Sequence, residues 1–406
     1  MSALFPFRAL RPVPEAAARV ASVPYDVVST EEARAIAAGN PLSFLHITRS
    51  EIDLPAGTNP YDAAVYEQAV RNFEALKRDA PMVMDDEPAL YFYRLAMGAH
   101  VQTGLAGCFS LDEYDLNLIK KHEKTRKDKE DDRTRHMVDL RAQTGVVFLT
   151  YHRVATVDEI AERAQETPPL YDLTAPDGVR HTIWRVTGAH RDALVAAVRD
   201  VPAMYIADGH HRAASADRAR TALATGGHRT ADAATFIAVA FPDNQVRILP
   251  YNRVVRDLAG ETADSLVAAI RTREIVVRAG TATPERPGRV SMYLAGHWHT
   301  IELPAPPAGT PRAEALDVEV LQRQVLEPVL KVGDVRTDKR IDFVGGIRGT
   351  AELERLVNTG EAAVAFSMFP VSLGDLMAIA DAGGIMPPKS TWFEPKLRDG
   401  LLVHLI

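Results

Sequence analysis

The feature that most constrains this chain is the pentapeptide DGHHR at 208–212, which lies between an apolar run and an alanine-rich stretch. The run at 201–207 reads VPAMYIA and predicts a buried strand, whereas 213–225 predicts a helix. A glycine at the turn between them, Gly209, lets the backbone approach a ligand closely. The sequence therefore predicts a strand, a tight turn and a helix in direct succession.

This turn combines an anion-binding backbone with acid–base side chains. The first N–H groups of a helix point back toward the turn and favour an anion. Arg212 adds a planar guanidinium suited to phosphate, and His210 and His211 lie beside it. Asp208 ends the strand with a carboxylate that can hold a magnesium ion or accept a proton. The alternative interpretation is a polar helix start that happens to contain histidines.

The composition bounds the class of protein. The chain has 406 residues, which at roughly 150 per domain predicts two or three domains. A net charge of −7 argues against general nucleic-acid coating, so we expect no nucleic-acid partner. The single Cys108 excludes an internal disulfide and fits a reducing cytoplasm. Neither a signal-peptide pattern nor an 18-residue apolar run is present, so we expect a cytoplasmic protein without a membrane partner.

A dense run of charges occupies 120–136, KKHEKTRKDKEDDRTRH, where eight Lys or Arg residues and five acids fall within 17 positions. A solvated helical face held by ion pairs is one interpretation. The other is a loop that closes over a polyphosphate and its magnesium, because phosphoryl transfer needs both cations and carboxylates. On that hypothesis we expect the run to share a site with 208–212. Its candidate site residues are His122 for substrate, Glu123 for catalysis, Arg126 and Arg133 for phosphate, and Asp132 for magnesium.

Two further loops contain candidate residues. The loop at 383–391, GGIMPPKST, ends in Lys389, Ser390 and Thr391, which can contact phosphate, although the spacing differs from that of a P-loop. A tight connection before a final strand at 401–406 is the alternative for this loop. Near the N-terminus, Tyr25 and Asp26 lie in a proline-framed loop and can reach a substrate, unless they only pack an N-terminal arm.

Periodicity predicts an irregular alternation of strands and helices, which indicates an α+β fold with a mixed sheet. A proline-rich start surrounds a short helix at 30–38, capped by Ser29 or Thr30. We expect a first domain over 1–260 and a smaller C-terminal α/β unit over 261–406, which contributes the 383–391 loop. The other expected helices span 61–78, 265–275, 314–330 and 351–360. The expected strands span 89–95, 104–110, 145–151, 182–186 and 201–207, followed by a pair at 235–240 and 246–249 and a hairpin at 289–294 and 297–303.

The strand–DGHHR–helix unit resembles the phosphate-binding motif of the ParB/sulfiredoxin superfamily, and within it that of the free-serine kinases, Asp-Gly-His-x-Arg. From PFRALRP at 6–12 to MPPKST at 386–391, the chain also resembles a bacterial family described as a domain of unknown function. Sulfiredoxins need a cysteine in the motif, where this chain has histidine. DNA-loading ParB proteins carry a helix-turn-helix domain and a basic surface, and neither pattern is visible in this sequence.

The resemblance implies a ParB/sulfiredoxin-like core and a phosphotransferase with an alcohol group as acceptor. Residue by residue, Asp208, His210 and Arg212 match the kinase motif, and Glu123 is our candidate for its upstream glutamate, ahead of Glu31 and Glu32. The predicted activity is magnesium-dependent transfer of phosphate from ATP or ADP to a small hydroxyl substrate, with free L-serine as first candidate. A nucleotide-binding regulatory switch and a phosphatase with the same phosphate cradle remain alternatives. The sequence predicts no oligomeric state.

Overall fold

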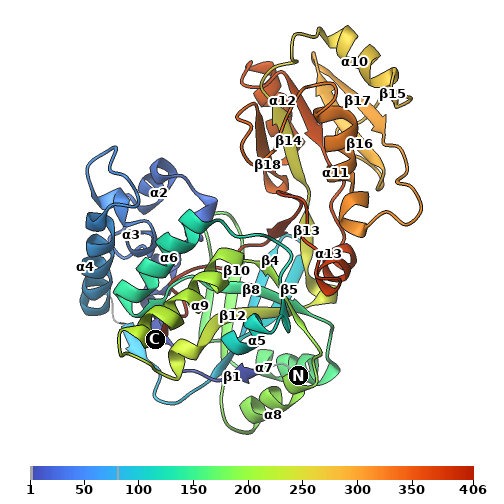
Figure 1. Cartoon of the computed structure of the whole chain (residues 1–406). Helices are drawn as coiled ribbons and strands as arrows, with labels where there is room; N and C mark the ends of the chain where they lie inside the picture. The colour runs from blue at the N-terminus through green and yellow to red at the C-terminus, as the bar shows by residue number, and fades with distance from the viewer. Residues whose placement is uncertain (1–2, 80–81) are drawn as a thin grey trace. The chain divides into compact units, whose positions relative to one another are not determined.

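The structure is a computed structural model that describes residues 3–79 and 82–406. The chain forms two compact units, Met1–Val246 with Pro395–Ile406 and, between them, Arg247–Glu394 (Figure 1). The predicted division at residue 260 therefore differs from the observed one. The reason is a non-local strand pair: β13 (Arg247–Leu249) pairs antiparallel with β20 (Trp392–Glu394), which joins the start of the second unit to its end.

Nine strands form the main sheet of the first unit within the described residues, in the order β6-β11-β8-β12-β5-β4-β10-β9 with β1 beside β5. The β11–β6 and β12–β8 pairs are parallel and the other pairs are antiparallel, so the predicted α+β fold with a mixed sheet is confirmed. The strands are β1 (Leu4–Phe5), β4 (Leu90–Met97), β5 (His100–Ser110), β6 (Ile119–Lys120), β8 (Val147–Tyr151), β9 (Tyr171–Thr174), β10 (Arg180–Val186), β11 (Met204–Asp208) and β12 (Thr235–Pro242).

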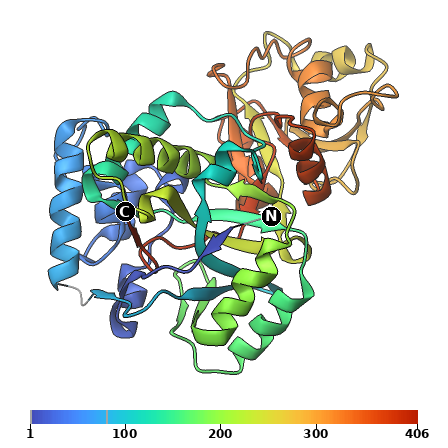
Figure 2. The ribbon, with the colours of Figure 1, turned by 60° about the horizontal axis from the view of Figure 1, so that its bottom comes forward.

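One face of this sheet forms the core of the first unit. Side chains in register across the strands belong to a single apolar cluster: Trp184, Phe92, Leu105, Ala240, Leu149 and Ile206. Helices α7 (Ala155–Gln165), α8 (Gly188–Arg199) and α9 (His210–Thr225) contribute further apolar side chains to the cluster. Helices α7 and α8 lie side by side (Figure 2), and α9 lies against α6 (Lys127–Leu140) (Figure 1). The motif at 208–212 is therefore anchored by a buried strand on one side and a packed helix on the other.

A second apolar cluster joins the N-terminal helices to the end of the chain. It contains Val20 from α1 (Pro14–Val20), Phe44 and Ile47 around α3 (Leu45–Thr48), and Phe73 from α4 (Ala63–Asp79). Ser29 caps α2 (Thr30–Ala37), which confirms one of the two predicted caps, and the structure adds a reciprocal capping box with Glu32. The remaining short elements here are η1 (Tyr25–Val27), η2 (Ser50–Asp53), α5 (Leu111–Asp115), η3 (Asp232–Ala234), η4 (Asp243–Gln245) and the strand pairs β2 (Leu10–Pro12) with β3 (Met82–Met84) and β7 (Ala142–Gln143) with β21 (His404–Leu405).

The second unit contains an antiparallel sheet of the order β15-β17-β16-β19-β14-β18. The predicted hairpin is confirmed as β16 (Arg289–Leu294) and β17 (His297–Glu302). The predicted pairing of 246–249 with 235–240 is wrong, because β13 pairs β20 whereas β12 pairs β5 and β8. The other elements are β14 (Tyr251–Val255), α10 (Ala263–Arg271), β15 (Val276–Ala279), η5 (Arg312–Ala315), α11 (Asp317–Leu321), β18 (Ile341–Gly345), η7 (Gly346–Arg348), α12 (Gly349–Asn358), β19 (Val364–Ser367) and α13 (Leu373–Asp381).

Two predicted elements are shorter or more broken than expected. The single helix predicted over 314–330 is divided, because Leu316 is extended (ψ 142°) between η5 and α11, and a π-helical turn, η6 (Gln322–Leu326), follows. The final strand predicted over 401–406 pairs only at His404–Leu405. Among the described residues, none of the helices is both long and apolar enough to cross a membrane.

Candidate functional site

The turn between β11 and α9 has the geometry that the motif predicts. Gly209 takes the left-handed conformation (φ 94°, ψ 30°) at the N-cap of α9. Because glycine has no side chain, it provides no oxygen to cap the helix. A Cβ added there would lie 3.1 Å from Cζ and Nε of Arg212, so glycine is required both for the backbone angle and for the arginine. Since no side chain caps the helix, the first N–H groups of α9 are directed at the turn and suit an anion.

Asp208 lies between two cations. Its Oδ2 accepts a 3.0 Å hydrogen bond from Lys396 Nζ, and its Oδ1 lies 3.7 Å from an Arg212 terminal nitrogen. Burial alone would raise the pKa of Asp208, but Lys396 and then Arg212 hold it well below its usual range. The carboxylate is therefore ionised at neutral pH, while 29% of its side chain remains exposed to meet a ligand.

Arg212 is buried among acids. Its side chain is only 4% exposed, and one terminal nitrogen lies 3.6 Å from Asp26 Oδ2 as well as 3.7 Å from Asp208. The other terminal nitrogen donates to the carbonyl of Val146. Burial lowers the pKa of Arg212, yet Asp26, Asp208 and Asp399 raise it above its ordinary value. The guanidinium is thus held in one orientation beside the turn, and the predicted substrate residue Asp26 lies within this site.

Asp399 is the most unusual acid near Arg212. It is buried, with only 1% of the residue exposed. Burial raises the pKa of Asp399 to about 7, against the opposing effect of Arg212. A Cβ added to Gly145 would lie 3.0 Å from Arg212 Cδ and 4.0 Å from Asp399 Oδ1, which places the acid close to the buried stem of the arginine.

The coil at 121–126 runs beside the start of α9. The backbone N–H of His122 donates to His210 Nε2 at 3.4 Å, and the two rings meet edge to face with centroids 4.4 Å apart. Glu123 Oε2 lies 3.8 Å from His210 Nδ1. Burial lowers the pKa of both histidines, that of His122 to about 4, so both rings are neutral at pH 7. The His122 N–H thus orients the His210 ring through Nε2, and the Glu123 carboxylate faces Nδ1 of the same ring.

The same coil also contacts the second histidine. The backbone N–H of Arg126 donates to His211 Nε2 at 3.0 Å, whereas the Arg126 guanidinium pairs with Asp128 at 2.7 Å. The predicted proximity of 120–136 to 208–212 is confirmed by these contacts. The helical half of the run fits the other interpretation, since Lys127–Asp131 and Arg135–Asp139 are i,i+4 ion pairs on α6.

Asp132 and Arg133 form contacts outside the turn, and the magnesium role of Asp132 stays a prediction. Its Oδ1 accepts from the Tyr66 hydroxyl at 2.8 Å, and its Oδ2 accepts from Arg133 Nε at 2.8 Å. Arg133 also lies over the ring of Tyr25, 4.3 Å from its centroid, and donates to the carbonyl of Thr48. With both oxygens occupied and the residue buried, Asp132 stabilises the packing of α6 against α4. Within the described residues, no cluster of three or more His, Cys, Asp or Glu side chains suits a metal ion.

The 383–391 loop belongs to the second unit. Lys389 has a positive φ of 56°, and its Nζ lies 3.3 Å from the Tyr251 hydroxyl. Ser390 is buried and its hydroxyl donates to the carbonyl of Pro387. These contacts describe a tight connection that leads into β20, whereas the alternative expected one before a final strand at 401–406. Phosphate binding by Lys389, Ser390 and Thr391 stays a prediction.

Two site residues were missed by the sequence reasoning, Lys396 and Asp399. Both lie in the charged segment 394–400, EPKLRDG, which precedes the last apolar residues. The run of charges that ends in Asp-Gly marks this segment as a possible site. No local sequence pattern, however, links Lys396 to Asp208, which lies 188 residues earlier. The return of this segment to the first unit brings it to the motif: Arg398 reaches Asp177, and its N–H donates to the Tyr93 hydroxyl at 3.3 Å.

The fold and the motif define a two-unit α+β protein with a strand, a left-handed glycine turn and a helix at 204–225. Residues 4–322 match the family described as protein of unknown function (DUF1015), and the chain belongs to this family. No curated protein matches the chain.

Similarity to solved structures is distant in sequence. A conserved hypothetical protein from Pyrococcus furiosus is 14% identical, with a TM-score of 0.36 over 74% of this chain and 95% of that one. A free serine kinase in complex with AMP is 13% identical, with a TM-score of 0.36 over 73% and 91% of the two chains. SbnI with a C-terminal truncation, from Staphylococcus aureus, is 12% identical, with a TM-score of 0.39 over 74% and 87%.

Proposed function

We propose that the protein is a magnesium-dependent kinase that transfers phosphate from ATP or ADP to a small hydroxyl substrate, with free L-serine as the first candidate. The observation that supports this most is the arrangement at 208–212. An uncapped helix N-terminus, a buried guanidinium and an ionised carboxylate converge on one glycine turn. The sequence resemblance of Asp208, His210 and Arg212 to the free-serine kinase motif points to the same reaction class.

Phosphate binding is assigned to the start of α9. The N–H groups of its first turn and the macrodipole favour the anion. Arg212 and Lys396 supply positive charge on either side of Asp208. These are the groups that stabilise charge on a transferring phosphoryl group.

One carboxylate of this site, Asp208, has the chemistry of a magnesium ligand. Mg²⁺ commonly takes one or two protein carboxylates, with substrate phosphates and water as its other ligands. Asp208 is a partly exposed, ionised carboxylate at the phosphate site and fits that role, with no help from Asp132. Bound there with the nucleotide, the ion would neutralise developing phosphate charge.

The base role fits Glu123 and His210 better than Asp208. A proton acceptor works best when its pKa lies near the working pH, and that of Asp208 is held far below it. Glu123 is 53% exposed and 3.8 Å from a neutral His210, so the carboxylate is accessible and positioned. In the proposed step the substrate oxygen forms a bond to the terminal phosphorus. The bond to the bridging oxygen of the nucleotide breaks, and the hydroxyl proton passes to Glu123.

One incubation tests the proposal. The protein is mixed with ATP or ADP, magnesium and pooled amino acids, and phosphorus NMR follows the products. We expect a new phosphomonoester signal that depends on the amino acid pool and disappears when serine alone is left out. Release of inorganic phosphate alone would instead identify a phosphatase or hydrolase. Nucleotide binding without any turnover would identify a regulatory switch, and either result would overturn the kinase.

A further inference from the structure

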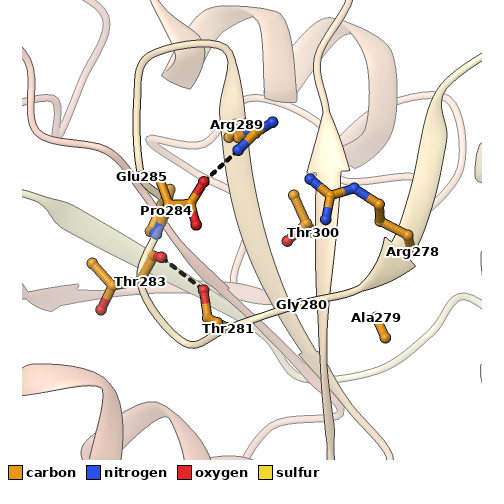
Figure 3. Close-up of a pocket in the computed structure, with 9 residues that line it drawn as sticks. All are labelled: Arg278, Ala279, Gly280, Thr281, Thr283, Pro284, Glu285, Arg289 and Thr300. Atoms are coloured by element: carbon orange, nitrogen blue, oxygen red, sulfur yellow. Dashed lines mark hydrogen bonds and ion pairs between the residues drawn. The ribbon is translucent and has the colours of Figure 1, made fainter.

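The second unit contains a pocket of its own, between β15, β17 and the loop 280–288 (Figure 3). Cross-strand register places polar residues in one row on this sheet face: Arg278 pairs with Thr300, and Thr300 pairs with Ser291. The adjacent row pairs Glu302 with Arg289. Farther along the same face, Tyr293 and Trp298 pack under α12, so the surface changes from apolar to polar where the loop covers it.

The loop that covers this polar surface is firmly anchored. The Gly280 N–H donates to the carbonyl of Trp298 at 3.0 Å, and the carbonyl of Gly288 accepts from Leu303 at 2.9 Å. A Cβ on Gly280 would lie 2.1 Å from Thr300 Oγ1, so the close approach of loop and strand requires glycine. Pro284, which belongs to this loop, is itself buried. The pocket is therefore a fixed feature of this unit.

The residues that line the pocket carry two guanidinium groups and one carboxylate, together with the hydroxyls of three threonines. Figure 3 shows Arg278 reaching across toward Thr300, and Arg289 paired with Glu285 on the loop. Glu302, outside the lining, also pairs with both arginines, at 3.1 Å to Arg278 and 2.8 Å to Arg289. Beside Thr300, the buried Ser291 hydroxyl has no hydrogen-bond partner among the residues that the structure describes.

Glu285, a residue of the loop, already occupies part of the pocket with its carboxylate. Its carboxylate lies 2.5 Å from Arg289, although 71% of its side chain is exposed, whereas Arg289 is only 20% exposed. An exposed partner of this kind is weakly held, because solvent screens the pair and the side chain retains alternative rotamers. An external anion with better geometry can replace it, since guanidinium binds carboxylate and phosphate through the same pair of donors.

We propose that this pocket is a binding site for a small oxyanion, carboxylate or phosphate, which replaces Glu285 on Arg289 and contacts Arg278 and the threonine hydroxyls. This proposal does not depend on the kinase activity proposed for the first unit. The residues of the proposed anion site all belong to the second unit and are separate from those of the DGHHR motif.

The test is calorimetric titration of the full chain with inorganic phosphate and, in a second arm, with acetate. Glu285→Gln removes the internal competitor, so we expect the affinity for the preferred anion to rise about two- to fivefold, the range of an exposed ion pair. Glu361→Gln is the matched control, because Glu361 is another exposed carboxylate of this unit, paired 2.6 Å from Arg355. We expect the control to leave the affinity unchanged.

A second variant tests the direct contact. Arg278→Gln on the Glu285→Gln background should weaken the anion at least tenfold, whereas Arg355→Gln should not, and circular dichroism checks that each variant is folded. Phosphate tighter than acetate identifies a phosphorylated ligand, and the reverse identifies a carboxylate. Equal affinity in Glu285→Gln and Glu361→Gln, or binding insensitive to Arg278, would overturn the proposal. Such binding would then belong to the first unit or to the general surface.

Discussion

Lys396 Nζ lies 3.0 Å from Asp208 Oδ2, although 188 residues separate the two along the chain. The pair joins the end of β11 to the segment that follows the whole second unit. The pair keeps the Asp208 carboxylate ionised, and it places the Lys396 ammonium beside the turn that precedes α9. The pair therefore connects the motif to the last segment of the chain and helps to hold the pKa of Asp208 below its usual range.

Asp208→Asn should retain the fold and lower turnover about 100-fold or more, because the amide neither holds magnesium nor carries the charge that pairs with Lys396. Steady-state kinetics over a magnesium series measures this. Asp172→Asn is the matched control, since Asp172 is a partly exposed acid of the same sheet, paired with Arg180. Full activity of Asp208→Asn with unchanged magnesium dependence would remove Asp208 from the mechanism.

Lys396→Gln should release Asp208 from its nearest cation, so that the pKa of this carboxyl rises and turnover falls about tenfold, with loss of activity beginning at a higher pH on the acid side. Lys396→Arg should restore part of the activity because charge is retained. Lys127→Gln removes a lysine from an exposed pair with Asp131 and should change nothing. An unaltered pH–rate profile for Lys396→Gln would mean that the pair only fastens the C-terminal segment.

Arg212→Lys should weaken nucleotide binding roughly tenfold, about 1.4 kcal/mol, because an ammonium cannot make two parallel bonds to phosphate. Its burial among Asp26, Asp208 and the Val146 carbonyl also predicts a lower melting temperature. Calorimetric titration and a melting curve are recorded for each variant. Arg220→Lys, on the same helix but paired with acids of α5, should leave the affinity unchanged. A lower melting temperature with unchanged nucleotide affinity would show that Arg212 is purely structural.

His122 makes stability depend on pH with a definite sign. Its pKa is about 4 in the folded chain and about 6.5 when unfolded, so below pH 6.5 the unfolded chain binds more protons. The free energy of unfolding therefore falls as the pH decreases from 6.5 toward 4. His122→Gln should reduce this slope by up to one proton, about 1.4 kcal/mol per pH unit. Urea unfolding at pH 5, 6 and 7 measures the slope.

His46 provides the opposite control. The hydrogen bond to Asp53 raises the pKa of His46 in the folded chain. The contribution of this pair to the free energy of unfolding is therefore complete below the pKa of the unfolded chain, and it is lost as the pH rises through the pKa of the folded chain. His46→Gln should therefore change the slope in the opposite direction. Identical slopes for the wild type and His122→Gln would contradict a neutral, buried His122.

Local signals predicted much of the site. The strand, glycine turn and helix at 201–225 are confirmed, because a buried apolar run, a left-handed glycine and an alanine-rich helix are each specified by nearby residues. The capping box at Ser29 and the hairpin at 289–302 were predictable for the same reason. Proximity of 120–136 to the motif was inferred from chemistry, and the backbone contacts to His210 and His211 confirm it.

The structure adds packing contacts to what the charge of Asp132 suggests. The sequence places it in a run of acids and bases where any carboxylate is a plausible metal ligand. In the structure this carboxylate is buried, and its two oxygens accept hydrogen bonds from Tyr66 and Arg133, while its magnesium role stays a prediction. Which of several similar side chains has an oxygen available for a ligand depends on packing, and sequence spacing does not encode it.

By itself, the sequence determined the α+β class, the strand–glycine turn–helix unit around 208–212 and the family to which the chain belongs. The tertiary structure decided the extent of the units and the partners of the turn. The β13–β20 pair closes the second unit, and the chain then returns so that Lys396 meets Asp208 and Asp399 is buried near Arg212. Helix and turn preferences act over a few residues, whereas strand pairing and ion pairing between distant segments depend on the folded path of the whole chain.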